Sequence, residues 1–142
     1  MKIDTDLSKI DQLLTRGVEN IYPTKDFLKD LLKSGKQLTL YTGYDPTSPT
    51  LHIGHGITML KSREFQELGH KVIMLIGDFT GMIGDPTDKL STRKQLTREQ
   101  VLENCKEYQK QASSVLNFEG KNPVEIKYNS EWLSKMNFAD LI

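Results

Sequence analysis

Apolar residues recur at helical spacing over the first 35 positions. Within 5–17 they are Leu7, Ile10 and Leu14, and within 24–35 they are Phe27, Leu28, Leu31 and Leu32. Steps of three and four residues predict a helix in each segment. Thr24 suits the N-cap of the second helix, and Gly17 and Gly35 suit the stops that follow the two helices.

Strand patterns alternate with helical ones from there on. The stretches "QLTLYTG" at 37–43 and "VEIKYNS" at 124–130 have the length and branching of strands, and "KVIMLIG" at 71–77 is nearly unbroken apolar sequence. Such a run is typical of a strand covered on both faces. The C-terminal stretch "EWLSKMNFADLI" at 131–142 looks like the start of a further helix.

Two helices are predicted between these strands. The first would end at Gly69 and carry an apolar stripe, and the second would begin with a capping box of Thr97 and Gln100. The expected stripe of the first consists of Ile57, Leu60, Phe65 and Leu68, and that of the second of Val101, Cys105, Tyr108, Ala112 and Val115.

Alternation of strands and helices predicts an α/β fold with a parallel sheet and right-handed crossovers, preceded by two N-terminal helices. We therefore divide the chain into a helical segment, 1–36, and an α/β segment, 37–142. The loops at 42–55 and 77–93 each follow a strand, so we expect both at the carboxyl edge of the sheet, where such folds bind ligands.

Composition narrows the class of protein. The chain has 142 residues with 19 basic and 19 acidic side chains, a balance that gives no support to a general nucleic-acid or membrane-surface binder. One cysteine excludes an intramolecular disulfide and favours a reducing compartment. Neither a signal peptide nor a run of about 20 apolar residues is present, so we expect a cytoplasmic protein.

The candidate chemistry lies in "YDPTSPTLHIGHG" at 44–56, where a strand gives way to a helix. His52 and His55 would point the same way from a first helical turn, and Gly54 between them leaves the backbone open. A helix N-terminus attracts anions, and imidazole N–H groups can hold phosphate oxygens, so this corner suits a nucleoside triphosphate. Two histidines at a turn are also common as surface residues or caps. A zinc site would need further ligands, and Cys105 fits a core position better.

The stretch "YTGYDPTSPTLHIGHG" resembles the HIGH signature of class I aminoacyl-tRNA synthetases, in the form carried by tyrosyl-tRNA synthetases. The resemblance extends to "TRGVENIYP", "FQELGHKVIMLIGDFTGMIGDPTDK", "STRKQLTREQV" and "NSEWL", in order along nearly the whole chain. It implies a Rossmann-like parallel sheet with helices on both faces, of the HIGH-type nucleotidyl-transferase class. It also implies ATP-dependent activation of L-tyrosine to tyrosyl-adenylate, followed by transfer to tRNA(Tyr).

The resemblance assigns roles to individual residues. His52 and His55 match the ATP-binding histidines, and Gly54 would lie under the adenine or ribose. Thr47 matches a threonine that helps hold the phosphates, while Asp45 and Thr58 would line the nucleotide pocket.

Four further residues lie outside this turn. Tyr41 matches a tyrosine that reaches the substrate phenol, although alone it suggests a packing aromatic; Asp85 matches the carboxylate that receives the substrate ammonium, although "GDP" alone is a turn. Lys89 and Arg93 match residues of a loop that closes over pyrophosphate, although a basic run is usually a solvated face. Asp78 we expect to be structural.

Parts of the family pattern are missing from the chain. The KMSKS-like loop, the second half of the sheet, the second carboxylate for the phenol and the RNA-binding domains have no counterpart in the sequence. We therefore expect an N-terminal portion of a longer enzyme, with an apolar sheet face and edge left exposed. The full enzyme would act as a homodimer on ATP, L-tyrosine and tRNA(Tyr), with Mg²⁺ inferred from ATP chemistry. The alternatives are another HxGH nucleotidyltransferase and a non-catalytic nucleotide- or protein-binding module.

Overall fold

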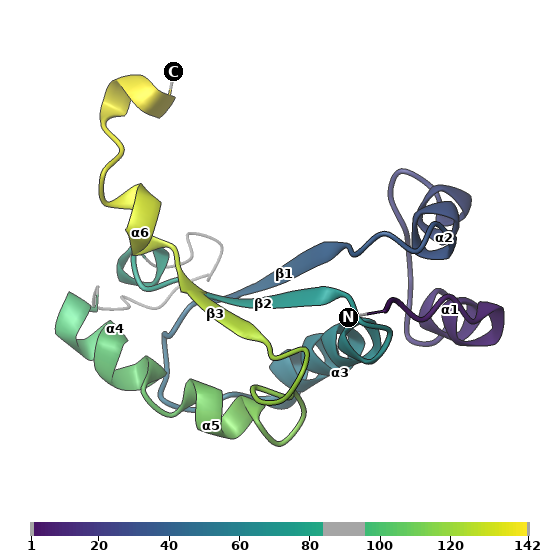
Figure 1. Cartoon of the computed structure of the whole chain (residues 1–142). Coiled ribbons are helices and arrows are strands. Elements are labelled where there is room, and N and C mark those ends of the chain that lie inside the picture. The colour runs from purple at the N-terminus through teal and green to yellow at the C-terminus, as the bar shows by residue number, and fades with distance from the viewer. Residues whose placement is uncertain (1, 84–95, 142) are drawn as a thin grey trace.

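The computed structural model describes residues 2–83 and 96–141 (Figure 1). Along the chain it contains α1 (Leu7–Leu13), α2 (Lys25–Lys33), β1 (Thr39–Tyr44), α3 (Ile53–Glu67), β2 (Lys71–Ile76), the 3-10 helix η1 (Thr80–Met82), α4 (Arg98–Cys105), α5 (Tyr108–Ala112), β3 (Glu125–Tyr128), α6 (Ser130–Leu133) and η2 (Phe138–Leu141). The expected alternation of strands and helices is confirmed.

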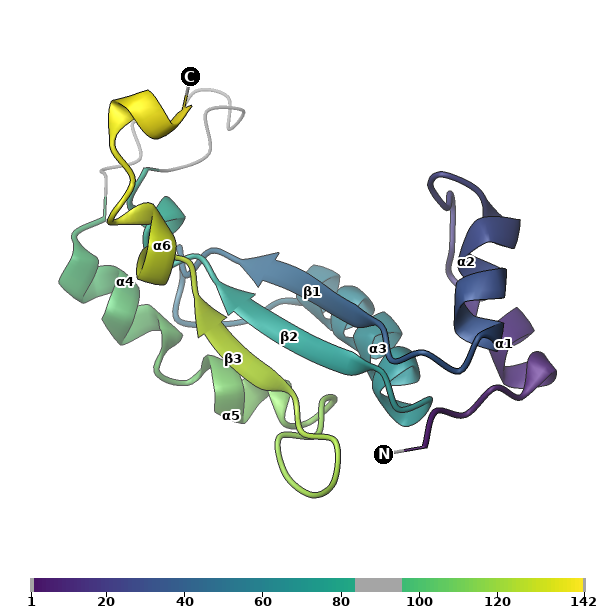
Figure 2. The same ribbon diagram turned by 45° about the horizontal axis from the view of Figure 1, so that its top comes forward.

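The three strands form a parallel sheet in the order β1-β2-β3 (Figure 2). The predicted α/β class is therefore confirmed. The helices that connect these strands, α3, α4 and α5, lie on one face of the sheet (Figure 1), whereas we expected helices on both faces. Right-handed crossovers that add each new strand in the same direction place every connecting helix on the same side.

The main core lies between the sheet and these helices. Val72, Met74 and Ile76 of β2 point into it, and it also takes in Met59 of α3 and Tyr108 of α5. The intervening β2 residues Ile73 and Leu75 are only half-buried, so β2 is fully covered on one face rather than on both. Alternate side chains of a strand point to opposite faces, which accounts for the pattern.

The face of the sheet away from the helices is uncovered, as expected: Tyr41 of β1 is 69% exposed there, and Ile73 and Leu75 of β2 are only half-buried. On α3, which lies on the other side of the sheet, Ile53 and Ile57 are 88% and 63% exposed. The predicted apolar stripe of α3 is therefore wrong for Ile57 and Leu60, since both are exposed. The buried residues of this helix are Met59, Ser62 and Gln66, two of them polar.

The N-terminal helices form a second, smaller core with Leu68 at the end of α3. Ile10, Leu13, Leu14 and Leu32 are buried there. Thr24 caps α2 as predicted, accepting a hydrogen bond from the Phe27 amide. Thr97 and Gln100 form the predicted capping box of α4, but the single helix expected through Val115 is broken into α4 and α5.

Candidate functional site

The two histidines lie next to each other at the start of α3, after the loop that follows β1. His52 is the N-cap residue of α3, and His55 lies in its first turn. Their imidazole rings stack with centroids 3.7 Å apart and planes 19° from parallel. The His52 backbone N–H donates to Nδ1 of His55 at 3.2 Å. Both rings therefore stand at the positive end of a 15-residue helix, where unpaired N–H groups favour anions.

This hydrogen bond fixes the protonation pattern of His55. Because Nδ1 accepts, the neutral ring must carry its proton on Nε2, and that N–H is the group left to donate to a ligand. Burial lowers the pKa of His55, and the neighbouring His52 lowers it further. A neutral donor at this position can bind phosphate oxygens without the pair having to hold two positive charges in contact.

Gly54 gives the His52 ring the room that it occupies in the stacked arrangement. A Cβ atom at this position would lie 3.0 Å from Cε1 and 3.1 Å from Nδ1 of His52. A side chain would therefore force the His52 ring to shift by a few tenths of an ångström relative to its position on His55. The sequence led us to expect an open approach for a ligand, whereas the structure shows that the glycine makes room for an imidazole of the same site.

Tyr44 and Thr58 both contact His55. The Tyr44 ring packs edge-on against His55 with centroids 5.6 Å apart, and its hydroxyl lies 3.2 Å from Thr58 Oγ1. Thr58 donates to the His55 carbonyl oxygen at 2.8 Å. Burial raises the pKa of Tyr44, which keeps its phenol protonated and able to donate. Thr58 was predicted as a nucleotide contact, and in the structure its hydroxyl is engaged by its own helix and by Tyr44.

Asp45 connects the β1 loop to the β2 loop. Its Oδ1 accepts from the Thr80 hydroxyl at 2.7 Å, and Asn129 Nδ2 donates to the same hydroxyl oxygen at 2.9 Å. Gly77 makes this contact possible, since a Cβ there would lie 1.8 Å from Asp45 Oδ1. The two strand-end loops thus meet at the carboxyl edge of the sheet, as the topology predicted for the described residues.

Thr47 lies in the same loop, exposed, with its backbone N–H bonded to the Asp45 carbonyl oxygen at 2.8 Å. The loop is tied to α4 and α5 by three side chains that the sequence analysis did not single out as site residues, namely Asn104, Tyr108 and Gln111. Their spacing of four and three residues on one helical face was the available signal.

The remaining predicted residues fall elsewhere. Tyr41 lies on the open face of β1, opposite to the face of Tyr44, paired in register with Ile73. Asp85, Lys89 and Arg93 lie outside the described residues. Asp78 is structural, as expected: it is 3% exposed, and its carboxylate accepts from the backbone N–H of Ser130 at 3.0 Å and from the Ser130 hydroxyl at 2.6 Å.

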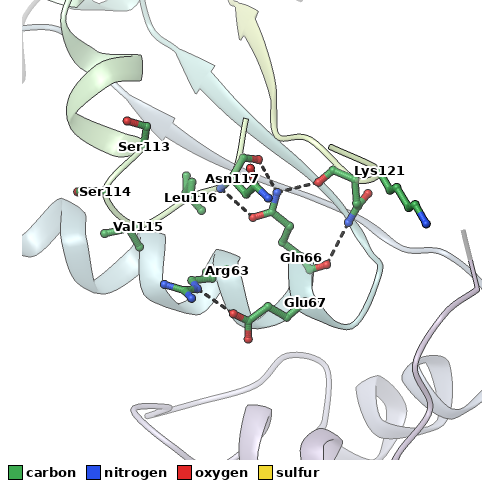
Figure 3. A pocket seen from close by; sticks show the side chains of 10 residues that line it. Arg63, Gln66, Glu67, Ser113, Ser114, Val115, Leu116, Asn117 and Lys121 are labelled. Carbon is green, nitrogen blue, oxygen red and sulfur yellow. Dashed lines mark hydrogen bonds and ion pairs between the residues drawn. The ribbon is translucent and has the colours of Figure 1, made fainter. Parts of the chain in front are cut away.

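A separate cleft of about 470 Å³ opens at the other end of α3, beside the loop before β3 (Figure 3). Gln66 lines this cleft, and its side-chain amide donates to the carbonyl oxygens of Asn117 and Asn122 and accepts from the Asn117 N–H. Arg63, which also lines the cleft, forms an ion pair with Glu67. Its polar groups thus serve the fold. Within 2–83 and 96–141, no three His, Cys, Asp or Glu side chains are grouped to hold a metal ion. No helix in the described part of the chain could span a membrane.

Comparison with known proteins places this geometry in a family. The profile described as tRNA synthetases class I (W and Y) matches residues 33–142. Tyrosine–tRNA ligase of Idiomarina loihiensis is 49% identical over 138 residues, which cover 97% of this chain and 33% of that protein. Tyrosine–tRNA ligase of Carboxydothermus hydrogenoformans is 46% identical over 147 aligned positions, which cover 100% of this chain and 34% of that protein.

Solved structures agree on the fold. The truncated mitochondrial tyrosyl-tRNA synthetase of Aspergillus nidulans superposes with a TM-score of 0.78 at 23% identity, over 96% of this chain and 41% of that one. The C-terminally truncated mitochondrial tyrosyl-tRNA synthetase of Coccidioides posadasii superposes with a TM-score of 0.72 at 26% identity, over 96% of this chain and 39% of that one. The chain spans about a third of the length of the curated relatives it matches. With the family profile covering the α/β sheet and the histidine corner, the chain belongs to the class I tRNA synthetases of the tryptophan and tyrosine group.

Proposed function

We propose that this chain forms the ATP-binding part of a tyrosine–tRNA ligase, which activates L-tyrosine as tyrosyl-adenylate and transfers it to tRNA(Tyr). The observation that carries the proposal is the stacked pair of His52 and His55 at the start of α3. Curated relatives named tyrosine–tRNA ligase support the choice of amino acid.

The proposed first step is attack of the tyrosine carboxylate on the α-phosphorus of ATP, with pyrophosphate as the leaving group. The nucleophile is ionised at neutral pH, so the step needs no general base. Catalysis then consists of positioning and of stabilising the charge that develops on the phosphate oxygens. The Nε2–H of His55 and the N-terminal amides of α3 can supply such donors without reorganising during the reaction.

The other predicted residues would contact the phosphates of ATP and the tyrosine substrate. Thr47 would bind the phosphates, and Asp45 would order the turn that carries Thr47, since its carboxylate is already held by Thr80. Tyr41 would face the substrate phenol from the open face of β1. Asp85 would receive the substrate ammonium.

For the basic residues we propose that Lys89 and Arg93 bind the departing pyrophosphate. Substitution of either by alanine should slow adenylate formation and leave binding of tyrosine almost unchanged. An equal loss in both would contradict that role.

The whole protein would also need a metal ion and a second copy of itself. Mg²⁺ would arrive with ATP, because this ion is usually bound through substrate phosphates with few protein ligands. We also propose a homodimer in the cytoplasm, with 1–36 as a helical segment that precedes an α/β segment, 37–142.

A chimera tests this function. The first third of the Idiomarina loihiensis tyrosine–tRNA ligase, which aligns with 97% of this chain, is replaced by this sequence. The chimera should exchange labelled pyrophosphate into ATP when tyrosine is added, but not when phenylalanine is added. The His52→Ala, His55→Ala double variant should lose this exchange by several orders of magnitude while it remains folded. A folded chimera without exchange, or with exchange that ignores tyrosine, would contradict the proposal.

A further inference from the structure

Four hydrogen bonds fasten the loop at 46–51 to one face of α4 and α5. Asn104 Nδ2 donates to the Pro46 carbonyl oxygen at 2.9 Å, and the Tyr108 hydroxyl donates to that of Ser48 at 2.6 Å. Gln111 makes the other two bonds. Its Nε2 donates to the Pro49 carbonyl oxygen and its Oε1 accepts from the Leu51 N–H, both at 2.9 Å.

The three side chains come from one surface of the segment that contains α4 and α5. Positions 104, 108 and 111 are spaced as neighbours on a helix, although α4 and α5 are separate by two residues. Their partners follow each other along the loop, which runs beside α4 and α5 in Figure 1. Tyr108 is 1% exposed, so its hydroxyl bond to the loop is made at the edge of the main core.

The loop belongs to no helix or strand, and its other restraints are local. The Thr47 N–H donates to the Asp45 carbonyl oxygen, the Thr50 N–H donates to the Ser48 hydroxyl at 3.3 Å, and Pro46 is buried, while Pro46 and Pro49 have no N–H to donate. The four bonds to α4 and α5 are the ones that tie the loop to a distant part of the chain. Fixing each backbone residue of a free loop costs conformational entropy, and a ligand that must order the loop binds more weakly by that cost. This segment carries Thr47 at one end and leads directly into His52 at the other.

We propose that Asn104, Tyr108 and Gln111 are positioning residues that hold the 46–51 loop in the conformation in which Thr47 and the His52–His55 pair bind the phosphates of ATP. This role rests on the proposed function, because ATP is the ligand it serves. The three residues act through the backbone of the loop.

Variants of the 142-residue chain test the role. Gln111→Ala removes two of the four bonds, and Tyr108→Phe removes a single hydroxyl. Gln109→Ala is the matched control, since it makes the same change on the exposed side of α5, and Tyr22→Phe is the control for the tyrosine. ATP affinity is measured by calorimetry, and amide hydrogen exchange of the ligand-free chain reports the order of the loop.

Gln111→Ala should speed the exchange of the Leu51 amide and weaken ATP binding about tenfold, and Tyr108→Phe should weaken it about fivefold. Both controls should stay within twofold of the wild type. A third variant, Gln111→Glu, keeps the acceptor for the Leu51 N–H but loses the donor to the Pro49 carbonyl oxygen. Its Leu51 amide should therefore exchange as slowly as in the wild type, while its ATP affinity stays below that of the wild type. A role in folding alone would change the melting temperature and leave the affinity of the folded chain unchanged.

The two proposals fail in different ways. A wild-type chain that binds no ATP would overturn the proposed function, and the positioning role with it, even if Leu51 exchange responds to Gln111→Ala. A wild-type chain that binds ATP, with the same affinity in Gln111→Ala and Gln109→Ala, would overturn the positioning role alone.

Discussion

Gly77→Ala should disrupt the junction between the two strand-end loops. The added Cβ would lie 1.8 Å from Asp45 Oδ1 and 2.5 Å from Thr80 Oγ1, well inside contact distance. The Asp45 carboxylate must therefore move, and its 2.7 Å hydrogen bond from Thr80 breaks. Gly77 does not have a positive φ, so the backbone itself accepts alanine.

Two contributions determine how much Gly77→Ala lowers the free energy of unfolding. Loss of a hydrogen bond to a carboxylate costs about 1 kcal/mol here, less than for a buried charged group, because Asp45 is exposed. Forcing a methyl group into an occupied site costs about 2 kcal/mol. The sum of about 3 kcal/mol corresponds to a fall in melting temperature of about 10 °C for a chain of this size.

Urea unfolding followed by circular dichroism measures this loss. Gly43→Ala is the matched control, because it lies at the end of β1 and a Cβ there meets nothing within 4 Å. The control should change stability by less than about 1 kcal/mol. Asp45→Ala should relieve part of the effect of Gly77→Ala in the double variant. Equal stabilities for Gly77→Ala and Gly43→Ala would show that the Asp45 carboxylate does not depend on the space beside Gly77.

Three further predictions concern other parts of the chain. His70 is fully buried with Nε2 unpaired among the described residues, and burial lowers its pKa. The free energy of unfolding should therefore be largest above the unfolded pKa of about 6.5 and fall as the pH drops below it, because only the unfolded chain then takes up the proton. Urea unfolding at a series of pH values should show this dependence for the wild type and a flatter one for His70→Gln. Lys61 donates to the carbonyl oxygens of Leu13 and Arg16 at the end of α1, so Lys61→Met should cost about 1.5 kcal/mol in the same assay, and a loss no larger than that of the surface variant Lys106→Met would contradict it. Gly54→Ala should shift the His52 ring by a few tenths of an ångström and weaken ATP binding in calorimetry while the chain stays folded, and unchanged affinity would count against the stacked pair as the binding group.

Local patterns were sufficient to predict most helices and strands of the fold. Thr24 and the pair of Thr97 and Gln100 act as caps because capping depends on residues three apart, which the sequence displays directly. The buried face of α3 could not be predicted in this way. Ser62 and Gln66 are buried because they find hydrogen-bond partners far along the chain, such as Asn117 for Gln66, and apolar periodicity carries no information about such partners.

Local sequence predicted one part of the candidate site and could not predict another. Adjacency of His52 and His55 follows from a spacing of three residues at a helix start, and the structure confirms it. The groups that support the site do not follow from local sequence. Gln111 lies 60 residues from its partner Leu51, and Gly77 matters because Asp45, in the loop after β1, lies against it. These contacts depend on the order in which the sheet assembles, which only the fold reveals.

Phosphate binding by the histidine pair is tested most directly by titrating the isolated chain with ATP and following the imidazole ¹⁵N resonances of its three histidines. We expect saturable shifts for His52 and His55, with the largest change at Nε2 of His55, and no change for His70, which is buried away from this corner in the turn before β2. Saturable binding of ATP that leaves both His52 and His55 unshifted would contradict the claim that this stacked pair holds the phosphates.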